Sequence, residues 1–312
     1  MKYLSEFRDP ILADKLVNEL KKDVGLLSSG NNVRIMEVCG GHTHTIFKYG
    51  LEQLLPKEIE LIHGPGCPVC VLPMNKVDEC VLLAEEKQVI LTTFGDAIRV
   101  PGSKKSLLQA KAEGADIRIV YSPMDALDIA SRNPDKDVVF FALGFETTMP
   151  STALTIQEAK KRQILNFSIL CNHITIPQTL KALLDTDNLN LDAFIGPGHV
   201  NMIIGTEVYD FIVNKYKKPI VVSGFEPLDI LQSLSMLIKQ LIENRCEIEN
   251  QYKRVVSKEG NIIAQEAIND VYMIKEFSEW RGLGLIPESG VKLRNEYKLS
   301  LIHISEPTRL RR

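Results

Sequence analysis

Two cysteine-containing turns near the start of the chain combine residues that suit metal binding or redox reactions. The first reads Cys39-Gly40-Gly41-His42-Thr43-His44, and the second reads Gly64-Pro65-Gly66-Cys67-Pro68-Val69-Cys70. Thiolate sulfur is a soft ligand for transition metals, and the C-x-x-C spacing also suits a thiol–disulfide couple. The sequence therefore predicts a metal site, a redox-active dithiol, or both.

Cys39 is expected to end a strand over Val33–Val38 and to precede a helix that begins near Thr45. A thiol close to a helix N-terminus is biased toward the thiolate, the form that binds metals and acts as a nucleophile. Gly40 and Gly41 would let the backbone approach a ligand closely. The alternative is a buried cysteine followed by glycines that only turn the chain.

The second turn places Pro68 between Cys67 and Cys70, which stiffens the turn and holds both sulfurs on one side. This spacing occurs in dithiol redox sites and in half of a zinc site. Together with Cys39 and His42, the pair also matches a Cys₃His zinc set. Zinc ribbons are small autonomous units, whereas these turns belong to separate strand–helix units, so zinc is the alternative metal.

Two further turns carry polar groups after predicted strands. His199 follows Gly196-Pro197-Gly198, a turn that mirrors the one before Cys67. Glu146 is a candidate proton relay, and Thr147 and Thr148 either offer hydroxyls to an anion or diatomic ligand or cap the next helix.

The remaining histidines and cysteines have weaker signals. His42 and His44 are candidate ligands, proton carriers or hydrogen-bond partners, and we expect only one of them to be functional. Cys171 is ambiguous, whereas Cys80 and Cys246 are expected to pack in the interior.

Strand-like runs alternate with amphipathic, helix-like segments for most of the chain. The expected strands are Val33–Val38, Ile59–Ile62, Val89–Thr93, Ile117–Tyr121, Val138–Leu143, Phe167–Leu170, Ala193–Ile195 and Pro219–Val222. The expected helices are Asn75–Lys87, Ser151–Arg162, Met202–Lys215, Leu228–Glu243, Glu247–Arg254 and Glu266–Phe277, with a turn-rich segment at Gly282–Gly290. This alternation predicts an α/β fold of doubly wound parallel sheets.

The polar and reactive residues fall directly after the expected strands. Because the carboxyl ends of parallel strands lie at one edge of a sheet, such residues would converge on one ligand-binding rim. Gly-Pro-Gly and Gly-Phe-Glu each occur twice, at 64–66 and 196–198 and at 144–146 and 224–226. Either two similar halves of the chain or a chance repetition of turn residues would explain these repeated tripeptides.

The bulk composition excludes several classes of protein. The chain has 312 residues, 45% apolar and 25% charged, with a net charge of −3. No basic stripe favours a nucleic-acid partner, no apolar run reaches membrane-spanning length, and the charged N-terminus lacks a signal-peptide core. We therefore expect a cytoplasmic protein, in which six cysteines indicate metal or redox chemistry rather than a disulfide framework.

The motifs taken together resemble the HypD family of nickel–iron hydrogenase maturation factors. The matching blocks are Cys39–Thr45, Gly64–Cys70, Gly144–Thr148 and Gly196–Val200, and Asn250-Gln251-Tyr252 and Trp280-Arg281-Gly282-Leu283-Gly284 also look like family signatures. The resemblance runs from the N-terminus to about Leu299.

The resemblance implies two α/β domains facing a central cleft and a C-terminal domain with a 4Fe–4S cluster. It implies a scaffold on which iron receives two cyanides and a carbonyl before delivery to the hydrogenase large subunit. HypC would be the partner chaperone and HypE the cyanide donor. Cys39 would be the iron ligand and Cys67 and Cys70 the redox-active dithiol, while His199, Glu146 and Thr147 would line the cleft.

This chain differs from the family in the residues that bind the cluster. In the family, four cysteine ligands lie near the C-terminus, whereas no cysteine follows Cys246 in this sequence. We expect a first domain over 1–135, a second over 136–246, a helical segment over 247–299 leading to a missing cluster domain, and a non-native tail over 300–312. Two alternatives stay open beside the assembly scaffold. They are a thiol–disulfide oxidoreductase that uses Cys67 and Cys70, and a zinc-binding module.

Overall fold

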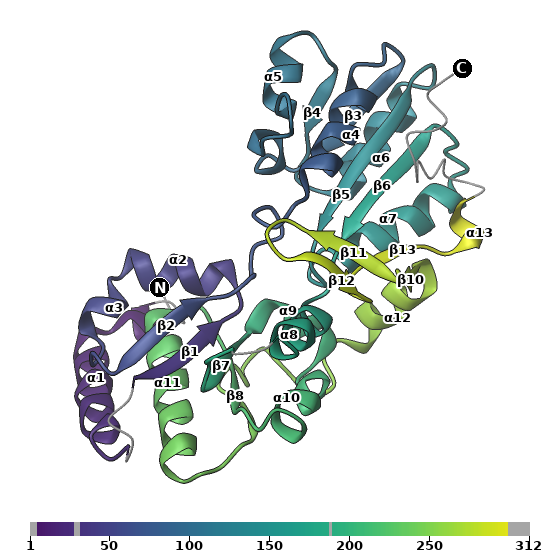
Figure 1. Ribbon diagram of the computed structural model, residues 1–312. Helices are drawn as coiled ribbons and strands as arrows, with labels where there is room; N and C mark the ends of the chain where they lie inside the picture. The colour runs from purple at the N-terminus through teal and green to yellow at the C-terminus, as the bar shows by residue number, and fades with distance from the viewer. Residues whose placement is uncertain (1–4, 28–31, 187–188, 299–312) are drawn as a thin grey trace. The chain divides into compact units, whose positions relative to one another are not determined.

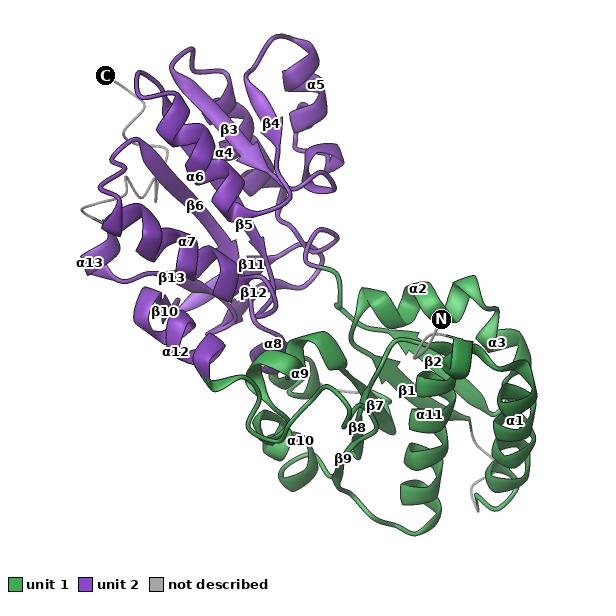
Figure 2. Ribbon diagram, turned by 180° about the vertical axis from the view of Figure 1, so that it is seen from behind, with its two compact units in different colours: residues 1–67, 180–262 green, residues 68–179, 263–312 purple. Residues whose placement is uncertain are grey.

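The computed structural model describes residues 5–27, 32–186 and 189–298, and these form two compact units. Unit 1 comprises Met1–Cys67 and Leu180–Ile262, and unit 2 comprises Pro68–Thr179 and Ile263–Arg312 (Figure 2). The chain therefore passes from unit 1 to unit 2 inside the C-x-x-C turn and returns later to complete unit 1. The expected tail over 300–312 lies outside the described residues.

Unit 1 is built on a five-stranded parallel sheet with the order β2-β1-β7-β8-β9. Figure 1 labels β2, β1, β7 and β8, and Figure 2 labels β9 as well. Its strands are β1 (Val33–Glu37), β2 (Ile59–His63), β7 (Ala193–Pro197), β8 (Ile220–Ser223) and β9 (Ile248–Asn250). Its helices are η1 (Ser5–Arg8), α1 (Pro10–Val24), α2 (Gly40–Lys48), α3 (Leu51–Leu54), α9 (Gly198–Ile204), η3 (Glu207–Tyr209), α10 (Asp210–Asn214) and α11 (Pro227–Ile242). The helix α8 (Ile176–Leu184) spans the return from unit 2.

Unit 2 is built on a four-stranded parallel sheet with the order β4-β3-β5-β6. Its strands are β3 (Val89–Thr93), β4 (Ile117–Ile119), β5 (Asp137–Gly144) and β6 (Phe167–His173). Its helices are α4 (Met74–Ala84), η2 (Ala97–Arg99), α5 (Leu107–Ala112), α6 (Pro123–Arg132) and α7 (Met149–Lys161), with α12 (Ile262–Val271) and α13 (Asn295–Lys298) from the C-terminal part. Two antiparallel pairs complete it, β10 (Tyr272–Ile274) with β13 (Val291–Leu293) and β11 (Phe277–Trp280) with β12 (Gly284–Pro287).

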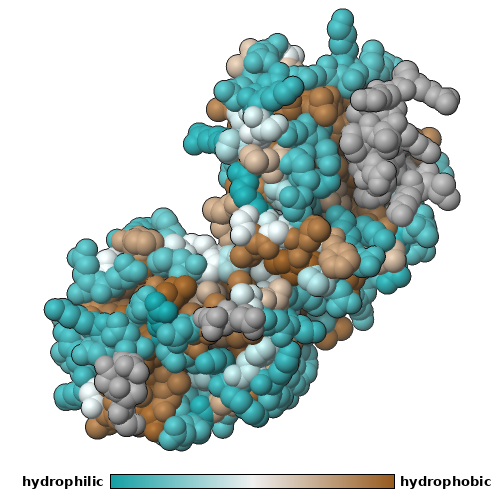
Figure 3. All heavy atoms as spheres, viewed as in Figure 1, coloured by the Kyte–Doolittle hydropathy of each residue, from teal (hydrophilic) through white to brown (hydrophobic). Residues whose placement is uncertain are grey.

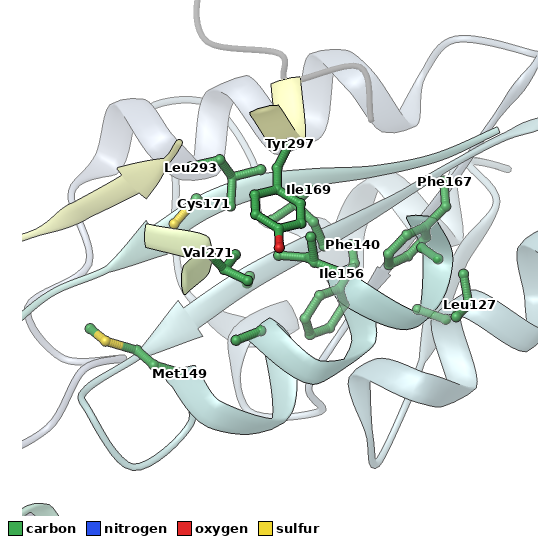
Figure 4. Close-up of a cluster of buried hydrophobic side chains, with 14 of the residues drawn as sticks. Leu127, Phe140, Met149, Ile156, Phe167, Ile169, Cys171, Val271, Leu293 and Tyr297 are labelled. Carbon is green, nitrogen blue, oxygen red and sulfur yellow. The ribbon is translucent and has the colours of Figure 1, made fainter. Parts of the chain in front are cut away.

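The core of unit 2 explains why its central strand is apolar at every position from Val138 to Leu143. Side chains alternate between the two faces of a strand. Val138, Phe140 and Ala142 accordingly join one hydrophobic cluster, part of which is drawn in Figure 4, while the residues between them join a second cluster. A sheet covered on both faces is the doubly wound architecture that the alternating elements predict.

All eight predicted strands are confirmed, within a few residues at their ends. The predicted helix Met202–Lys215 is interrupted, because α9 ends at Ile204 and Gly205 caps it with a positive φ of 75°. The helix predicted near Thr45 begins earlier, at Gly40, so that Cys39 is its N-cap residue.

The C-terminal expectations need more correction. The segment Glu247–Arg254, predicted to be helical, contributes β9, because Ile248 pairs in parallel with Ile220 at the open edge of β8. The predicted helix Glu266–Phe277 ends at Val271 and turns into β10. In its described residues, the segment 247–299 therefore contains the short strands β9 to β13 as well as the helices α12 and α13, since pairing with neighbouring strands overrides a weak helical pattern.

The two units do not follow the expected consecutive division into 1–135 and 136–246. The strands β1 and β2 share a sheet with β7, β8 and β9, whereas β3 to β6 form the other sheet. The two Gly-Pro-Gly turns, at 64–66 and 196–198, therefore lie in the same unit. Crossover connections decide which strands pair, and sequence order alone does not reveal them.

The surface is consistent with the composition. The face seen in Figure 3 is largely hydrophilic, with apolar residues gathered in separate patches. In the described part of the chain, no helix is both long and apolar enough to cross a membrane.

Candidate functional site

The loops that follow β1, β2, β7 and β8 bring chemistry-bearing residues to one edge of the unit 1 sheet. These strands run parallel, so their carboxyl ends share that edge. Cys39 follows β1, Cys67 follows β2, His199 follows β7 and Phe225 follows β8. We call this edge the thiol rim.

Backbone hydrogen bonds hold the loops after β1 and β2 against each other. The Gly40 N–H donates to the Gly66 carbonyl oxygen (3.0 Å), and the Gly64 N–H donates to the Glu37 carbonyl oxygen (2.8 Å). A Cβ atom at position 66 would lie 2.3 Å from the Cys39 nitrogen, so only glycine permits this approach. The structure thus places the loops of Cys39 and Cys67 side by side.

Glu37 is a buried carboxylate that the sequence analysis missed. It is fully buried, and its Oε2 accepts a hydrogen bond from the Cys39 N–H (2.9 Å). Its Oε1 accepts from the Thr43 hydroxyl and lies 2.8 Å from His63 Nδ1. A charged residue two positions before Cys39, in an otherwise largely apolar strand, was the available signal.

The thiol of Cys39 is held in its protonated form by its surroundings. Burial raises the pKa of this thiol to about 11, the N–H groups of Gly41 and His42 lower it, and the Glu37 carboxylate raises it. The predicted bias toward thiolate is therefore wrong for this arrangement, because desolvation outweighs the helix N-terminus.

Cys67 and Cys70 are disulfide-bonded, while Cys39, Cys80, Cys171 and Cys246 are free. The C-x-x-C pair is therefore close enough to cycle between disulfide and dithiol. A sulfur in a disulfide is not the thiolate that zinc requires, so the Cys₃His set with Cys39 and His42 is not formed in this state.

Three stacked rings lie beside Cys39. Phe225 stacks on His42 at a centroid distance of 4.7 Å and on His199 at 3.7 Å. A Cβ atom at position 41 would lie 2.8 Å from the Phe225 ring and 3.7 Å from Cys39 Sγ, which shows how close this ring comes to the first loop. Sequence reasoning singled out both histidines but missed Phe225, whose Gly-Phe-Glu repeat was the only signal.

The two histidines of the first loop have different environments. His42 is fully buried, its Nε2 lies 3.3 Å from the Ser223 carbonyl oxygen, and burial lowers its pKa to about 4. Its Nδ1 has no hydrogen-bond partner and lies 4.0 Å from Glu37 Oε2. His44 is exposed on α2. Of the two, His42 is the one integrated into the thiol rim.

The second polar turn lies in unit 2, after β5. Glu146 is buried, its Oε1 accepts from the Ile176 N–H (3.0 Å), and its Oε2 has no partner. Burial raises the pKa of this carboxyl to about 7, so it can hold or release a proton near neutrality. Thr147 is exposed, and Thr148 is the N-cap of α7 without a side-chain cap bond, its hydroxyl donating to the Phe145 carbonyl oxygen (3.2 Å).

The other cysteines are packing residues or lie apart from the thiol rim. Cys80 is fully buried in one hydrophobic cluster of unit 2 and Cys171 lies in the other, beside Val271 and Leu293 (Figure 4). Cys246 is partly buried, with its thiol 3.7 Å from the Val213 carbonyl oxygen. The free cysteines of the described chain therefore do not form the four-thiolate set of a 4Fe–4S cluster.

Comparison with known proteins identifies the family. A family model described as "HypD: Hydrogenase formation hypA family" matches residues 12–302. The chain belongs to the HypD family. Hydrogenase maturation factor HypD of Rhodobacter capsulatus is 57% identical over 301 residues, which cover 96% of this chain and 80% of that protein. Its Escherichia coli (strain K12) counterpart is 55% identical over 300 residues, with the same coverage.

A further relative extends the comparison. Hydrogenase maturation factor HypD2 of Bradyrhizobium diazoefficiens is 49% identical over 304 residues, covering 95% of this chain and 79% of that protein. Membership in the HypD family places the chain among hydrogenase maturation proteins, and it confirms the resemblance drawn from the motifs.

Proposed function

We propose that this HypD-family chain is the scaffold on which an iron ion receives cyanide and carbonyl ligands before delivery to the large subunit of a nickel–iron hydrogenase. The observation that carries the proposal is the contact between the loops of Cys39 and Cys67, which brings a free thiol beside one end of a disulfide. Under this proposal, the iron ligand Cys39 and one cysteine of the redox-active pair, Cys67, share the thiol rim. Iron is the cargo in this scheme.

Cys39 would bind the iron through its sulfur, and cyanide and carbonyl would take other coordination positions. Among residues 5–27, 32–186 and 189–298, no group of three or more His, Cys, Asp or Glu side chains is placed to hold a metal ion. The thiol would lose its proton on binding the cation, since thiolate is the ligating form. Glu37 would orient the loop through the Cys39 N–H, as a buried carboxylate near a metal ligand commonly does.

Cys67 and Cys70 would supply electrons. Oxidation of the dithiol to the disulfide releases two electrons and two protons, and an external dithiol or other reductant must restore it. In unit 1, His199 would take part in ligand placement, with Gly40, Gly41, His42 and His44 around the bound ligands. In unit 2, Glu146 would handle protons, with Thr147 and Thr148 next to it in the same turn. We propose HypC and HypE as partners and the cytoplasm as location, as the family resemblance implies.

The proposal is tested by metal analysis and infrared spectroscopy of protein purified without oxygen together with its maturation partners. We expect bound iron with cyanide and carbonyl stretching bands in the natural sequence, and loss of iron in Cys39→Ala. Cys246→Ala, which removes a thiol away from the rim, is the matched control and should retain iron. Retention of iron by Cys39→Ala would show that the ligand assignment is wrong.

The disulfide favours a second candidate, a thiol–disulfide oxidoreductase that uses Cys67 and Cys70 without iron. Metal analysis of the same preparation distinguishes the two candidate functions. A metal-free protein whose dithiol cycles with a partner would support the oxidoreductase, and stoichiometric zinc would support the zinc-binding module.

A further inference from the structure

The motif Trp280-Arg281-Gly282-Leu283-Gly284 has no role in the function proposed above. It forms the end of β11 and the turn into β12, within unit 2. Trp280 is the only tryptophan of the chain and is 1% exposed. A large side chain buried so completely in a short two-stranded pair must be packed against other elements.

On one side, this turn holds the segment that follows the C-x-x-C pair. The Arg281 N–H donates to the carbonyl oxygen of Val71, the residue after Cys70, at 2.8 Å. The Arg281 guanidinium donates to the Pro101 carbonyl oxygen (2.9 Å), and Asn75 Nδ2 donates to Glu279 Oε2 (2.7 Å). Three hydrogen bonds therefore join the hairpin to the segments that contain Val71, Asn75 and Pro101.

On the other side, the same turn holds the segment around Glu146. The Trp280 ring stacks on Phe145, the residue before Glu146, with centroids 5.9 Å apart and planes at 26°. Trp280 Nε1–H donates to Ser289 Oγ (2.9 Å), and the Ser289 carbonyl oxygen accepts from the Thr175 N–H (2.9 Å). The next residue, Ile176, donates its N–H to Glu146 Oε1.

We infer that Trp280 and Arg281 are positioning residues that couple the redox state of Cys67 and Cys70 to the placement of the Glu146 carboxyl group. Adjacent residues of one turn contact both segments, so a shift of Val71 when the disulfide opens is transmitted to Phe145 and Thr175. The inference rests on the redox role proposed for the cysteine pair. It concerns contacts inside unit 2 and needs no iron.

The unsubstituted chain of 312 residues supplies its own probe, because Trp280 is its single tryptophan. Reduction of the disulfide by dithiothreitol moves two electrons and two protons to the cysteine pair and leaves the reagent as a cyclic disulfide. The count of free thiols then rises from four to six. We expect the emission of Trp280 to change in step with that count, and to stay constant in a Cys67→Ser/Cys70→Ser variant.

The proposed coupling gives Trp280 different interaction energies in the two redox states, so changing Trp280 should change the redox equilibrium of the cysteine pair. We expect Trp280→Leu to shift the equilibrium constant with glutathione by about fivefold, the lower end of typical couplings, and Trp280→Phe to shift it less because it retains a ring against Phe145. The control is Leu285→Ala on β12 of the same hairpin, where the side chain is 70% exposed, and it should leave the constant unchanged. Circular dichroism checks that each variant is folded.

An unchanged emission on full reduction of the natural sequence would overturn the inference, and that measurement depends on no variant. An equilibrium constant in Trp280→Leu equal to that of Leu285→Ala would overturn it as well. Neither readout uses iron, so a chain that fails to retain iron refutes the proposed function without deciding the coupling.

Discussion

The thiol rim of unit 1 and the Glu146 turn of unit 2 are held in place by different means. In unit 1, backbone hydrogen bonds between neighbouring loops and close approaches at glycine fix the positions of Cys39 and Cys67. In unit 2, a buried carboxyl group is held by one backbone N–H and is supported by a hairpin more than one hundred residues further along the chain.

The two units also differ in how many buried side-chain nitrogen and oxygen atoms lack a hydrogen-bond partner. Among the described residues, unit 1 contains three buried side-chain atoms without a partner, on His42, Gln240 and Asn250. Unit 2 contains six, on Glu146, Asn172, His173, Tyr272, Ser278 and Arg281. Each such atom costs free energy, and unit 2 contains more of them than unit 1. Glu146 is one of them, so the turn after β5 is the site whose charge responds to pH near neutrality.

The largest effect that would test this contrast concerns Glu146. Its pKa is raised from 4.5 to about 7, so its contribution to stability is fully present below pH 4.5 and is lost as the pH rises through 7. A shift of this size corresponds to about 3 kcal/mol. Urea unfolding of Glu146→Gln at pH 5 and pH 8 should therefore show a smaller decrease in stability than the natural sequence shows.

Glu276→Gln, an exposed carboxylate of the same unit, is the control and should keep the natural pH dependence. If Glu146→Gln loses as much stability between these pH values as the control, the buried carboxyl is not the sensitive group of unit 2.

A somewhat smaller effect is expected at Gly66. An alanine Cβ there would lie 2.3 Å from the Cys39 nitrogen, and the two loops would have to separate. Overpacking of this kind costs about 2–3 kcal/mol, which urea unfolding would measure. Gly95→Ala in unit 2, where the nearest atom to the new Cβ would be 3.4 Å away, should be close to neutral. Equal stabilities of the two variants would mean that backbone approach does not hold the thiol rim.

The smallest effect is expected at Phe225. Phe225→Leu removes two ring stacks, on His42 and His199, and should cost about 1 kcal/mol of unfolding free energy. The ring proton signals of both histidines in NMR spectra should also shift when the phenyl ring current is lost. Phe47→Leu, with a side chain 61% exposed, is the control. Unchanged histidine signals would show that the stack is absent in solution.

Much of the fold could be predicted because strands buried on both faces are continuous apolar runs, as in Val138–Leu143. The candidate site could be predicted where cysteine, glycine and histidine cluster within a few residues, as they do after β1 and β2. Phe225 and the ring contact of Trp280 could not be found this way, because their partners are distant in sequence. Glu37 was missed although two of its partners, Cys39 and Thr43, lie close to it in the sequence. The helix expected over Glu247–Arg254 failed for the same reason, since the open edge of β8 recruits this segment as β9.

The α/β class, the eight strands and the family can be derived from the order of residues alone, because short-range patterns of apolar, glycine and cysteine residues encode them. The folded chain was needed to show that β1 and β2 join β7, β8 and β9 in one sheet, and that burial keeps the Cys39 thiol protonated. Strand pairing and desolvation depend on which distant segments come together, and no local spacing of residues specifies that.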